Sequence, residues 1–430
     1  MMHKTGVIFD MDGVIVDTVS ALYQIYLSIL FRYGIEGSQS EFNELNGPSL
    51  QEISEILCSR HQSMPTPEVL TNDFELAHNK LYENIALIPD VIKVLQELKS
   101  SGVKIGLASS SNRRNINIIF KRFDLESYFH FTISGDEVSH AKPNPEIYRL
   151  AADKLNVQHI YAVDDSFHGI ESALQAGIST IQFTKDNPVI NQNTSYKIDK
   201  LKNIPNILKS PCQLLGRYNN FEFTLVDFDL SPYLKVIDDY WSKYKSDTMT
   251  NNDAYLYLKV IGNHIEVVKS TYKTVYYILQ NPDSTLAKVL FPIGVSGFIL
   301  DKNNHILLAK RSSFVTQYKN FYECPPSGSI ECIDTYQNQI LIELEEEVDI
   351  MKKDVASIKT IALLKDKNTN QFDIFCKINL ESNIQLHIKN NTEYSCFTLV
   401  PTKELNNFIT MHSCIPETSV VNLFFNYNSK

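Results

Sequence analysis

Acidic residues follow apolar runs at separate places in the first half of the chain. Asp10 and Asp12 follow the run TGVIF, and Asp164 and Asp165 end the run IYAVDD. Carboxylates that converge from separate segments repel one another unless a cation lies between them, and oxygen ligands of this kind suit Mg²⁺. A carboxylate beside Mg²⁺ can attack a phosphoryl group, and a second acid two residues away can protonate the leaving oxygen and then activate water. These residue types indicate metal-assisted phosphoryl transfer, although a single aspartate at a strand end is more often a turn or capping residue.

A parallel sheet with flanking helices is the arrangement that would bring these residues together. Strand-like apolar runs lie at residues 5–9, 103–111, 132–137, 160–166 and 178–183. Helical patterns separate them; in one, Val91, Leu95 and Leu98 share a face before Gly102 ends the helix. Alternating strands and helices predict a parallel sheet whose ligands bind beyond the carboxyl ends of the strands. The aspartates and Ser109 lie at those ends.

Four segments carry the most specific pattern of the first half, namely FDMDGVIVDT (9–18), LASSS (107–111), AKPNPEIY (141–148) and VDDSFHGIESALQAG (163–177). Together they resemble the haloacid dehalogenase (HAD) superfamily, and within it the β-phosphoglucomutase-type phosphatases. The resemblance covers about residues 1–209 and implies an α/β Rossmann-like HAD core. It also implies an inserted helical cap over about residues 17–86, which closes over the site and selects the substrate.

The resemblance also implies a role for each motif residue. Asp10 is the implied nucleophile, and Asp12 is the implied general acid and base. Ser109 and Lys142 are the implied phosphate-binding residues. The implied Mg²⁺ site consists of Asp10, the Asp12 carbonyl, Asp164 and Asp165. The expected substrate is a small phosphorylated metabolite, such as a sugar phosphate, hydrolysed through an aspartyl-phosphate intermediate.

The cap region departs from the mutase members of this group. They have a histidine four residues after the threonine of the first motif, where this chain has Leu22. They also carry basic residues around a cap glycine, where Asn46 and Leu50 flank residues 47–49 here. A mutase must bind a second phosphate in its cap, and these replacements remove the groups that would do so. A phosphomonoesterase is therefore favoured, and a sugar phosphomutase stays the alternative.

From residue 217 on, the pattern changes to strands joined by short turns. Strand-like runs lie at residues 221–228, 254–261, 264–270, 293–301, 305–312, 372–380 and 395–400. Helical patterns lie at residues 231–244, 335–348 and 416–427. A linker at residues 210–216 and an α+β domain with a mixed β-sheet over residues 217–430 are the expected organisation.

One of these helices, TYQNQILIELEEEV (335–348), combines an apolar stripe with an acidic face. Glu343, Glu346 and Glu347 are spaced i, i+3 and i+4 and share that face. Like charges at this spacing cost helix stability, so the arrangement favours a use for the acids, such as metal binding. An ordinary solvated acidic face is the alternative.

The acidic helix and the loop before it resemble the Nudix box. The matching positions are Gly328, Glu343, Leu344, Glu346, Glu347 and Ile350. The resemblance implies a Nudix fold that hydrolyses a nucleoside diphosphate-linked compound such as a nucleotide sugar, and it implies Glu343 as a catalytic residue. The implied Mg²⁺ or Mn²⁺ ligands are Gly328, through its carbonyl, and Glu343, Glu346 and Glu347.

Three positions fail to match the Nudix box, and they leave the activity of the second half open. Asp334 replaces a glutamate, Ile342 replaces an arginine and Asp349 replaces a glycine. The missing arginine would orient the carboxylates, and loss of such support typically weakens metal affinity or activity by ~10–100-fold. The alternative to a bifunctional hydrolase is therefore a HAD phosphatase joined to a non-catalytic module that binds a nucleotide or docks a partner.

Residues near the Nudix-like loop give weak indications of a substrate site. Lys310 and Arg311, at the end of a strand, suit phosphate binding or a solvated sheet edge. Tyr318, Phe321 and Tyr322 suit stacking on a base or sugar, or packing beneath the loop.

Composition limits the partners and the location. The 430 residues carry a net charge of -10, which argues against general nucleic-acid binding because such proteins concentrate lysine and arginine. The 7 cysteines form no CxxC pair, which indicates free thiols in a reducing compartment. No signal peptide pattern and no apolar run of ~18 residues is present, so we expect a cytoplasmic protein without membrane contact. The oligomeric state is left open.

Overall fold

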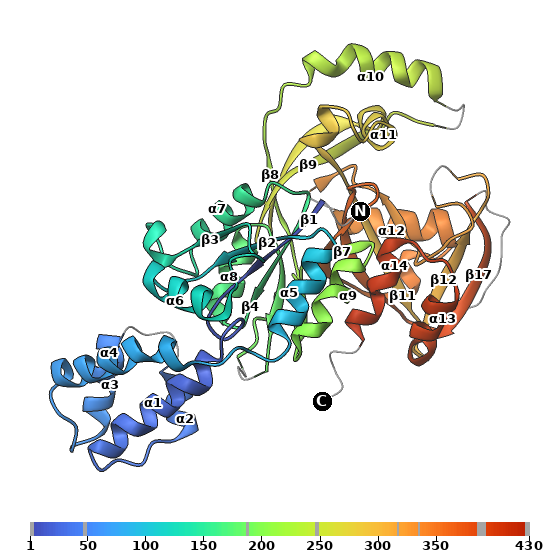
Figure 1. Cartoon of the computed structure of the whole chain (residues 1–430). Helices are drawn as coiled ribbons and strands as arrows, with labels where there is room; N and C mark the ends of the chain where they lie inside the picture. The colour runs from blue at the N-terminus through green and yellow to red at the C-terminus, as the bar shows by residue number, and fades with distance from the viewer. Residues whose placement is uncertain are drawn as a thin grey trace. The chain divides into compact units, whose positions relative to one another are not determined.

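The computed structural model describes residues 4–45, 50–185, 189–245, 249–315, 318–333, 336–384 and 393–425. Contacts divide the chain into two compact units (Figure 1). The first unit contains most of the chain up to Leu208, and the second contains residues 174–179, 192–195 and everything from Lys209 on.

Within the described residues, the first unit is built on a six-stranded sheet in the order β3-β2-β1-β4-β5-β6. Its strands are β1 (Thr5–Phe9), β2 (Lys104–Ala108), β3 (Phe131–Ile133), β4 (His159–Asp164), β5 (Ser179–Phe183) and β6 (Tyr196–Ile198). Strand β1 pairs in parallel with β2 and with β4, and the β2–β3 and β5–β6 pairs are also parallel. The predicted parallel α/β core is therefore confirmed.

Helices connect these strands, and their apolar stripes supply the core. They are α5 (Val91–Ser100), α6 (Arg113–Phe123), α7 (Glu146–Leu155), α8 (Phe167–Gln175) and α9 (Ile204–Lys209). In α5 the stripe expected from the sequence is buried, with Val91, Leu95 and Leu98 each at most 2% exposed. Helix α6 begins where the Asn112 side chain accepts a hydrogen bond from the Asn115 N–H, as a helix N-cap does.

The region between β1 and α5 is helical, as expected for the inserted segment. Its helices are α1 (Thr18–Arg32), α2 (Gln39–Glu44), α3 (Leu50–Arg60) and α4 (Pro67–Asn84). They enclose a small core of their own that includes Tyr26, Leu57 and Phe74. Asn46 and residues 47–49, which bear on the mutase alternative, lie outside the described residues.

The second unit contains a mixed sheet, which the sequence also predicted. The main path has the order β7-β15-β16-β11-β9-β10-β8, with β12, β13, β14 and β17 attached to it. The β11–β16 and β8–β10 pairs are parallel, whereas β15–β16 and β9–β10 are antiparallel. The bounds are β7 (Cys212–Gly216), β8 (Glu222–Leu225), β9 (Asp253–Ile261), β10 (His264–Thr271), β11 (Phe291–Leu300), β12 (His305–Arg311), β13 (Tyr322–Glu323), β14 (Ser327–Ser329), β15 (Val355–Asp366), β16 (Phe372–Leu380) and β17 (Tyr394–Pro401).

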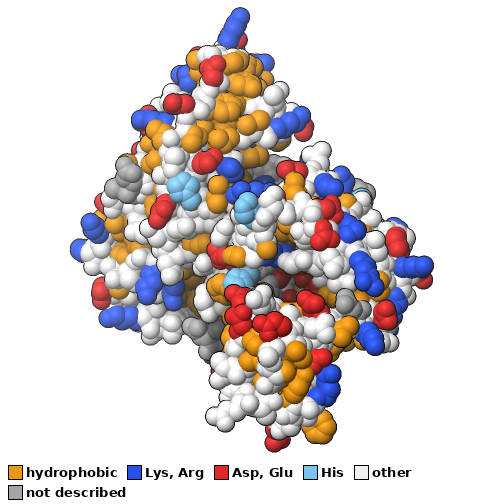
Figure 2. All heavy atoms as spheres, turned by 90° about the vertical axis from the view of Figure 1, so that its left-hand side faces the viewer, with side chains coloured by type: hydrophobic (Ala, Val, Ile, Leu, Met, Phe, Trp, Pro, Cys, Tyr) orange, Lys and Arg blue, Asp and Glu red, His pale blue; other side chains and the backbone are white. Residues whose placement is uncertain are grey.

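The helices of the second unit are α10 (Ser231–Tyr244), α11 (Tyr272–Gln280), α12 (Tyr336–Val348), α13 (Leu405–Met411) and α14 (Pro416–Val420). Helix α12 is the predicted acidic helix, and Tyr336, Ile340 and Leu344 bury its apolar stripe in the main core of the unit. On α10, Leu234, Val236 and Tyr244 are exposed. Figure 2 shows hydrophobic side chains gathered at the top of the face that it draws.

One expectation for the second half was wrong, and two of its elements were not predicted. The expected linker at residues 210–216 contains β7, which pairs with β15 inside the sheet. The strand β15 and the helix α11 were not anticipated, although β15 is twelve residues long. The strand state of β7 depends on a partner distant in the sequence, since β7 pairs with β15. Strand β15 also pairs with β16, the next strand along the chain.

Two further expectations concern compartment and membrane contact. All seven cysteines are free thiols. Among the described helices, none has the length and apolar character that a membrane span requires. The cytoplasmic location stays a prediction.

Candidate active site

The predicted site residues of the first unit meet at the carboxyl ends of three neighbouring strands. Asp10 follows β1, Ser109 follows β2, and Asp164 ends β4. Strand β1 lies between β2 and β4, so the chain order of the sheet reverses at β1. Such a reversal leaves a crevice at the carboxyl ends of the strands, where α/β proteins bind their ligands.

Three carboxylates form a compact cluster there. One carboxylate oxygen from each of Asp10, Asp164 and Asp165 lies within 4.8 Å of the others, and all three residues are buried. Burial, with the neighbouring carboxylates, raises the pKa of Asp10 to about 7 and raises that of Asp165 well above its usual value. Buried, oxygen-only and mutually repelling ligands fit Mg²⁺, because a divalent cation between them would offset the repulsion.

Lys142 lies against the same carboxylates. Its buried Nζ donates to Asp10 Oδ1 at 2.7 Å, to Asp164 Oδ2 at 2.8 Å and to the Ala108 carbonyl at 3.2 Å. Burial alone would lower the pKa of Lys142, but Asp10 and Asp164 outweigh it and raise the pKa well above its ordinary value. The ammonium therefore stays charged beside these two carboxylates.

Asp12 is held by hydroxyl groups rather than by Lys142. Its carboxylate accepts hydrogen bonds from Ser111 Oγ at 2.6 Å, from the Tyr82 hydroxyl at 2.9 Å and from Ser109 Oγ at 3.4 Å. Burial raises the pKa of Asp12, and the hydrogen bonds from Ser111 and Tyr82 oppose that rise. A carboxyl group with a raised pKa is suited to donate a proton to a leaving group.

Two glycines make room for the carboxylates. Gly13 has a φ of +75°, and a Cβ atom at this position would collide with the carboxylate of Asp165. A Cβ atom at Gly169, in α8, would collide with the carboxylate of Asp164. Both positions therefore require glycine if the acidic cluster is to keep its geometry.

Sequence reasoning missed three hydroxyl groups of this site. Ser111 lies in the segment LASSS that was singled out, yet only its neighbour Ser109 received a role. The Tyr148 hydroxyl donates a hydrogen bond to Asp164 Oδ2 at 2.7 Å, and Tyr148 is the last residue of the segment AKPNPEIY discussed above. Tyr82 comes from α4, far from Asp12 in the sequence, and no local pattern marks it.

A family model described as "Haloacid dehalogenase-like hydrolase" matches residues 7–183. A "phosphorylated carbohydrates phosphatase" of Thermotoga maritima is 30% identical over 214 residues, which cover 47% of this chain and 98% of the relative. The pyrophosphatase PpaX of Oceanobacillus iheyensis is 25% identical over 218 residues, covering 48% of this chain and 98% of the relative. The fructose-1-phosphate phosphatase YqaB of Escherichia coli is 27% identical over 181 residues, covering 41% of this chain and 94% of the relative.

The first half therefore places this chain in the haloacid dehalogenase-like hydrolase family. The prediction of a hydrolase of the phosphatase type is confirmed at this level. These matches concern the first half, so the Nudix resemblance of the second half stays a prediction.

The predicted second site is only partly assembled. The carboxylate of Glu343 lies so close to Gly328 that a Cβ atom there would collide with it. Glu347 is buried, accepts a weak hydrogen bond from the Ser327 N–H at 3.4 Å and accepts one from the Tyr394 hydroxyl at 3.0 Å. Glu346 is exposed. Within the described part of the chain, these three glutamates do not form a cluster as tight as that of Asp10, Asp164 and Asp165.

Burial is the main cause of the raised pKa values of two glutamates on this helix. It raises the pKa of Glu343 to about 7 and that of Glu347 well above its usual value. Ile342, which stands where the Nudix box has an arginine, is 48% exposed, and its hydrocarbon side chain has no group that could donate a hydrogen bond to the glutamates. Asp334 lies outside the described residues.

Several basic and aromatic residues near the loop contact other side chains of the second unit. Arg311 is mostly buried and donates to both carboxylate oxygens of Glu323 at 2.7 and 2.8 Å, so the alternative of a solvated edge does not hold for Arg311. Phosphate binding by Lys310 and Arg311 stays a prediction. The Tyr318 hydroxyl donates to Asp366, and Tyr322 packs edge-on against Phe408.

Proposed function

We propose that the first unit is a Mg²⁺-dependent phosphomonoesterase that acts through an aspartyl-phosphate on Asp10. The observation that carries this proposal is the position of Lys142, whose ammonium lies 2.7 Å from Asp10 and 2.8 Å from Asp164 beside the cluster with Asp165. One face of the site thus offers a nucleophilic carboxylate together with a fixed positive charge.

Each group has a defined part in the two steps. The Asp10 carboxylate attacks phosphorus as the bond to the leaving oxygen breaks, and Asp12 gives that oxygen its proton. Asp12 then takes a proton from water, which attacks the phosphoryl group on Asp10 and releases phosphate. Lys142 and Ser109 hold the phosphoryl oxygens. Mg²⁺ held by Asp10, Asp165 and the Asp12 carbonyl, with Asp164 in support, would offset the negative charge of the phosphoryl group.

Sugar phosphates are the substrate class that we favour. Two of the relatives are named as phosphatases of phosphorylated carbohydrates and of fructose 1-phosphate, and Leu22 removes a group that a mutase would need. Phosphate release from a panel of sugar phosphates and pyrophosphate tests this proposal. Asp10→Asn is expected to abolish release, whereas Asp153→Asn, at an exposed position on α7, is the matched control. Interconversion of hexose phosphate isomers without phosphate release would instead support the mutase.

For the second unit we propose a Nudix-type, metal-dependent hydrolase of a nucleoside diphosphate-linked compound, such as a nucleotide sugar. Glu343 against Gly328 and Glu347 against Ser327 support it, since both acids face the loop from α12. The exposed Ile342 favours the alternative, a non-catalytic binding module. Diphosphate hydrolysis with Mg²⁺ or Mn²⁺ that is lost in Glu346→Gln would support the enzyme, and a parent protein without this activity would support the module.

If both units are active, their reactions form a sequence. Cleavage of a diphosphate linkage yields a phosphomonoester, which is the substrate class of the first unit. The fusion of the two units in one chain motivates this hypothesis. Orthophosphate release from a nucleotide sugar by the parent protein, lost in Asp10→Asn and in Glu346→Gln alike, is the expected result.

A further inference from the structure

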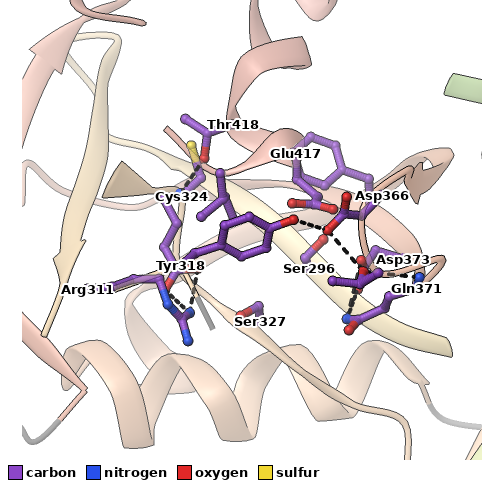
Figure 3. A pocket seen from close by; sticks show the side chains of 14 residues that line it. Ser296, Arg311, Tyr318, Cys324, Ser327, Asp366, Gln371, Asp373, Glu417 and Thr418 are labelled. Atoms are coloured by element: carbon purple, nitrogen blue, oxygen red, sulfur yellow. Dashed lines mark hydrogen bonds and ion pairs between the residues drawn. The ribbon is translucent and has the colours of Figure 1, made fainter. Parts of the chain in front are cut away.

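An acidic cavity lies within the second unit. Its volume is ≈ 80 Å³, and residues of β11, β13, β16 and α14 line it. Four of the lining side chains are carboxylic acids, and each is at most 8% exposed; they are Glu323, Asp366, Asp373 and Glu417. Figure 3 shows Asp366, Asp373 and Glu417 on one side of the cavity and Arg311 on the other.

The charges that line this cavity do not balance. Arg311 supplies the one basic side chain among the described lining residues, and it already binds Glu323 through both carboxylate oxygens. Three acids remain without a lining cation. Burial, followed by repulsion from Asp366 and Glu323, raises the pKa of Asp373 to about 7. Burial together with the neighbouring acids raises the pKa of Glu417 well above its usual value.

The lining groups also differ in how fully they are hydrogen bonded. Asp366 accepts from the Tyr318 hydroxyl, from the Asn368 N–H at 2.7 Å and from Thr369 Oγ1 at 2.9 Å. Asp373, in contrast, accepts long bonds of 3.2 and 3.4 Å from the Gln371 amide.

A serine hydroxyl adds independent support for a ligand site. Ser296 is 4% exposed, lines the cavity, and its Oγ has no hydrogen-bond partner within the described ranges. Figure 3 shows Ser296 among the three acids. A buried hydroxyl without a hydrogen-bond partner is unfavourable, so such groups are uncommon in folded proteins unless a ligand or water satisfies them.

We propose that this cavity binds a positively charged nitrogen group, an ammonium or guanidinium, of a small metabolite. Asp373 and Glu417 would supply the negative charge, and Ser296 Oγ would accept a hydrogen bond. Nitrogen cations bind carboxylates at ~2.7–2.9 Å, a longer reach than the ~2.0–2.6 Å of Mg²⁺ or Ca²⁺. Among the described residues, the carboxylate oxygens of these acids do not lie as close together as those of the Asp10 cluster. This wider spacing favours a nitrogen cation over a metal ion.

A larger neighbouring cavity has room for the remainder of such a ligand. It has a volume of ≈ 350 Å³ and shares Arg311, Ser327 and Gln371 with the acidic cavity. Its lining also includes Gly328, against which Glu343 lies, and the tyrosines at 272 and 276. The charged group would therefore orient the rest of the ligand along the loop beside α12. This binding does not require that the second unit be an enzyme.

Calorimetric titration of the full-length protein with methylguanidinium tests the proposal, with uncharged N-methylurea as the matched probe. We expect methylguanidinium to bind and N-methylurea not to bind. Asp373→Asn and Glu417→Gln keep the shape of the side chains but remove their charge, and each is expected to weaken binding at least about tenfold. Glu345→Gln, at an exposed position on α12, is expected to leave binding unchanged.

The outcomes separate this proposal from its alternatives. Both variants remove repulsion from the cavity, so circular dichroism is expected to show parent-like folding. Equal binding of the two probes, or unchanged binding in both variants, would overturn the proposal. The proposal would also be overturned if the parent protein did not bind methylguanidinium but bound Mn²⁺, and if Asp373→Asn abolished that Mn²⁺ binding. Glu346→Gln is expected to bind methylguanidinium normally, so the proposed hydrolysis and this binding fail independently.

Discussion

Lys142 is the residue whose replacement most directly tests how the first unit balances its buried charges. Methionine keeps the length of the side chain and removes its charge. In the native site the ammonium lies 2.7 Å from Asp10 and 2.8 Å from Asp164, and all three side chains are at most 9% exposed. Removal of one partner from a buried ion pair leaves an uncompensated charge, so we expect Lys142→Met to lower the free energy of unfolding by ~3–5 kcal/mol at pH 8 in metal-free protein.

The loss of stability is expected to depend on pH. Burial raises the pKa of Asp10 to about 7 even with Lys142 present, and without the ammonium this pKa should rise further. A carboxyl group whose folded pKa lies above its unfolded value contributes stability that is present at low pH and lost as the pH rises through the folded pKa. The deficit of Lys142→Met relative to the parent is therefore expected to be smaller at pH 5 than at pH 8.

Urea unfolding in EDTA, followed by far-UV circular dichroism at both pH values, measures this effect. The chain has a single tryptophan, Trp241, on α10 of the second unit, so its fluorescence reports unfolding of that unit separately. The matched control is Lys93→Met, at an exposed position on α5. A deficit equal to that of the control, or the same deficit at pH 5 and pH 8, would refute the reasoning. Phosphatase activity with Mg²⁺ is expected to fall by ~10²–10³-fold, because one preorganised charge is removed.

Three other perturbations test the same site. Gly13→Ala should reduce phosphate release by at least ~100-fold, because a Cβ atom at φ +75° would displace Asp165; unchanged activity would show that the cluster tolerates the shift. Tyr82→Phe should lower kcat by about tenfold with little change in KM, because it removes a 2.9 Å hydrogen bond to Asp12, and a change confined to KM would contradict this role. Chelation by EDTA should abolish phosphate release and added Mg²⁺ should restore it; activity that survives exhaustive chelation would exclude the proposed metal site.

Local sequence pattern was sufficient for much of the first unit. Strands β1 to β5 overlap the short apolar runs that the sequence shows, and helices such as α5 have a clear apolar stripe. The acids at the strand ends could be assigned to one site because the carboxyl ends of parallel strands meet at one edge of a sheet. In the second half, the strands β9, β10, β12 and β16 and the helices α10 and α12 were also anticipated, because their periodicity is local.

Only the tertiary structure determined which distant residues meet. The pairing of β7 with β15 turned an expected linker into part of a sheet, and no local pattern encodes such a pairing. The hydroxyl of Tyr82, on α4, donates a hydrogen bond to Asp12 across a sequence separation of 70 residues.

The acidic cavity of the second unit shows the same limit. Asp373 and Glu417 come from a strand and a distant helix, and each alone looks like an ordinary polar residue of its segment. Spacing along the chain was enough to predict the HAD motif residues and the elements with a clear local period, such as α5 and α12. Burial, charge balance and hydrogen bonding were decided by the folded structure, since they depend on side chains brought together from separate elements.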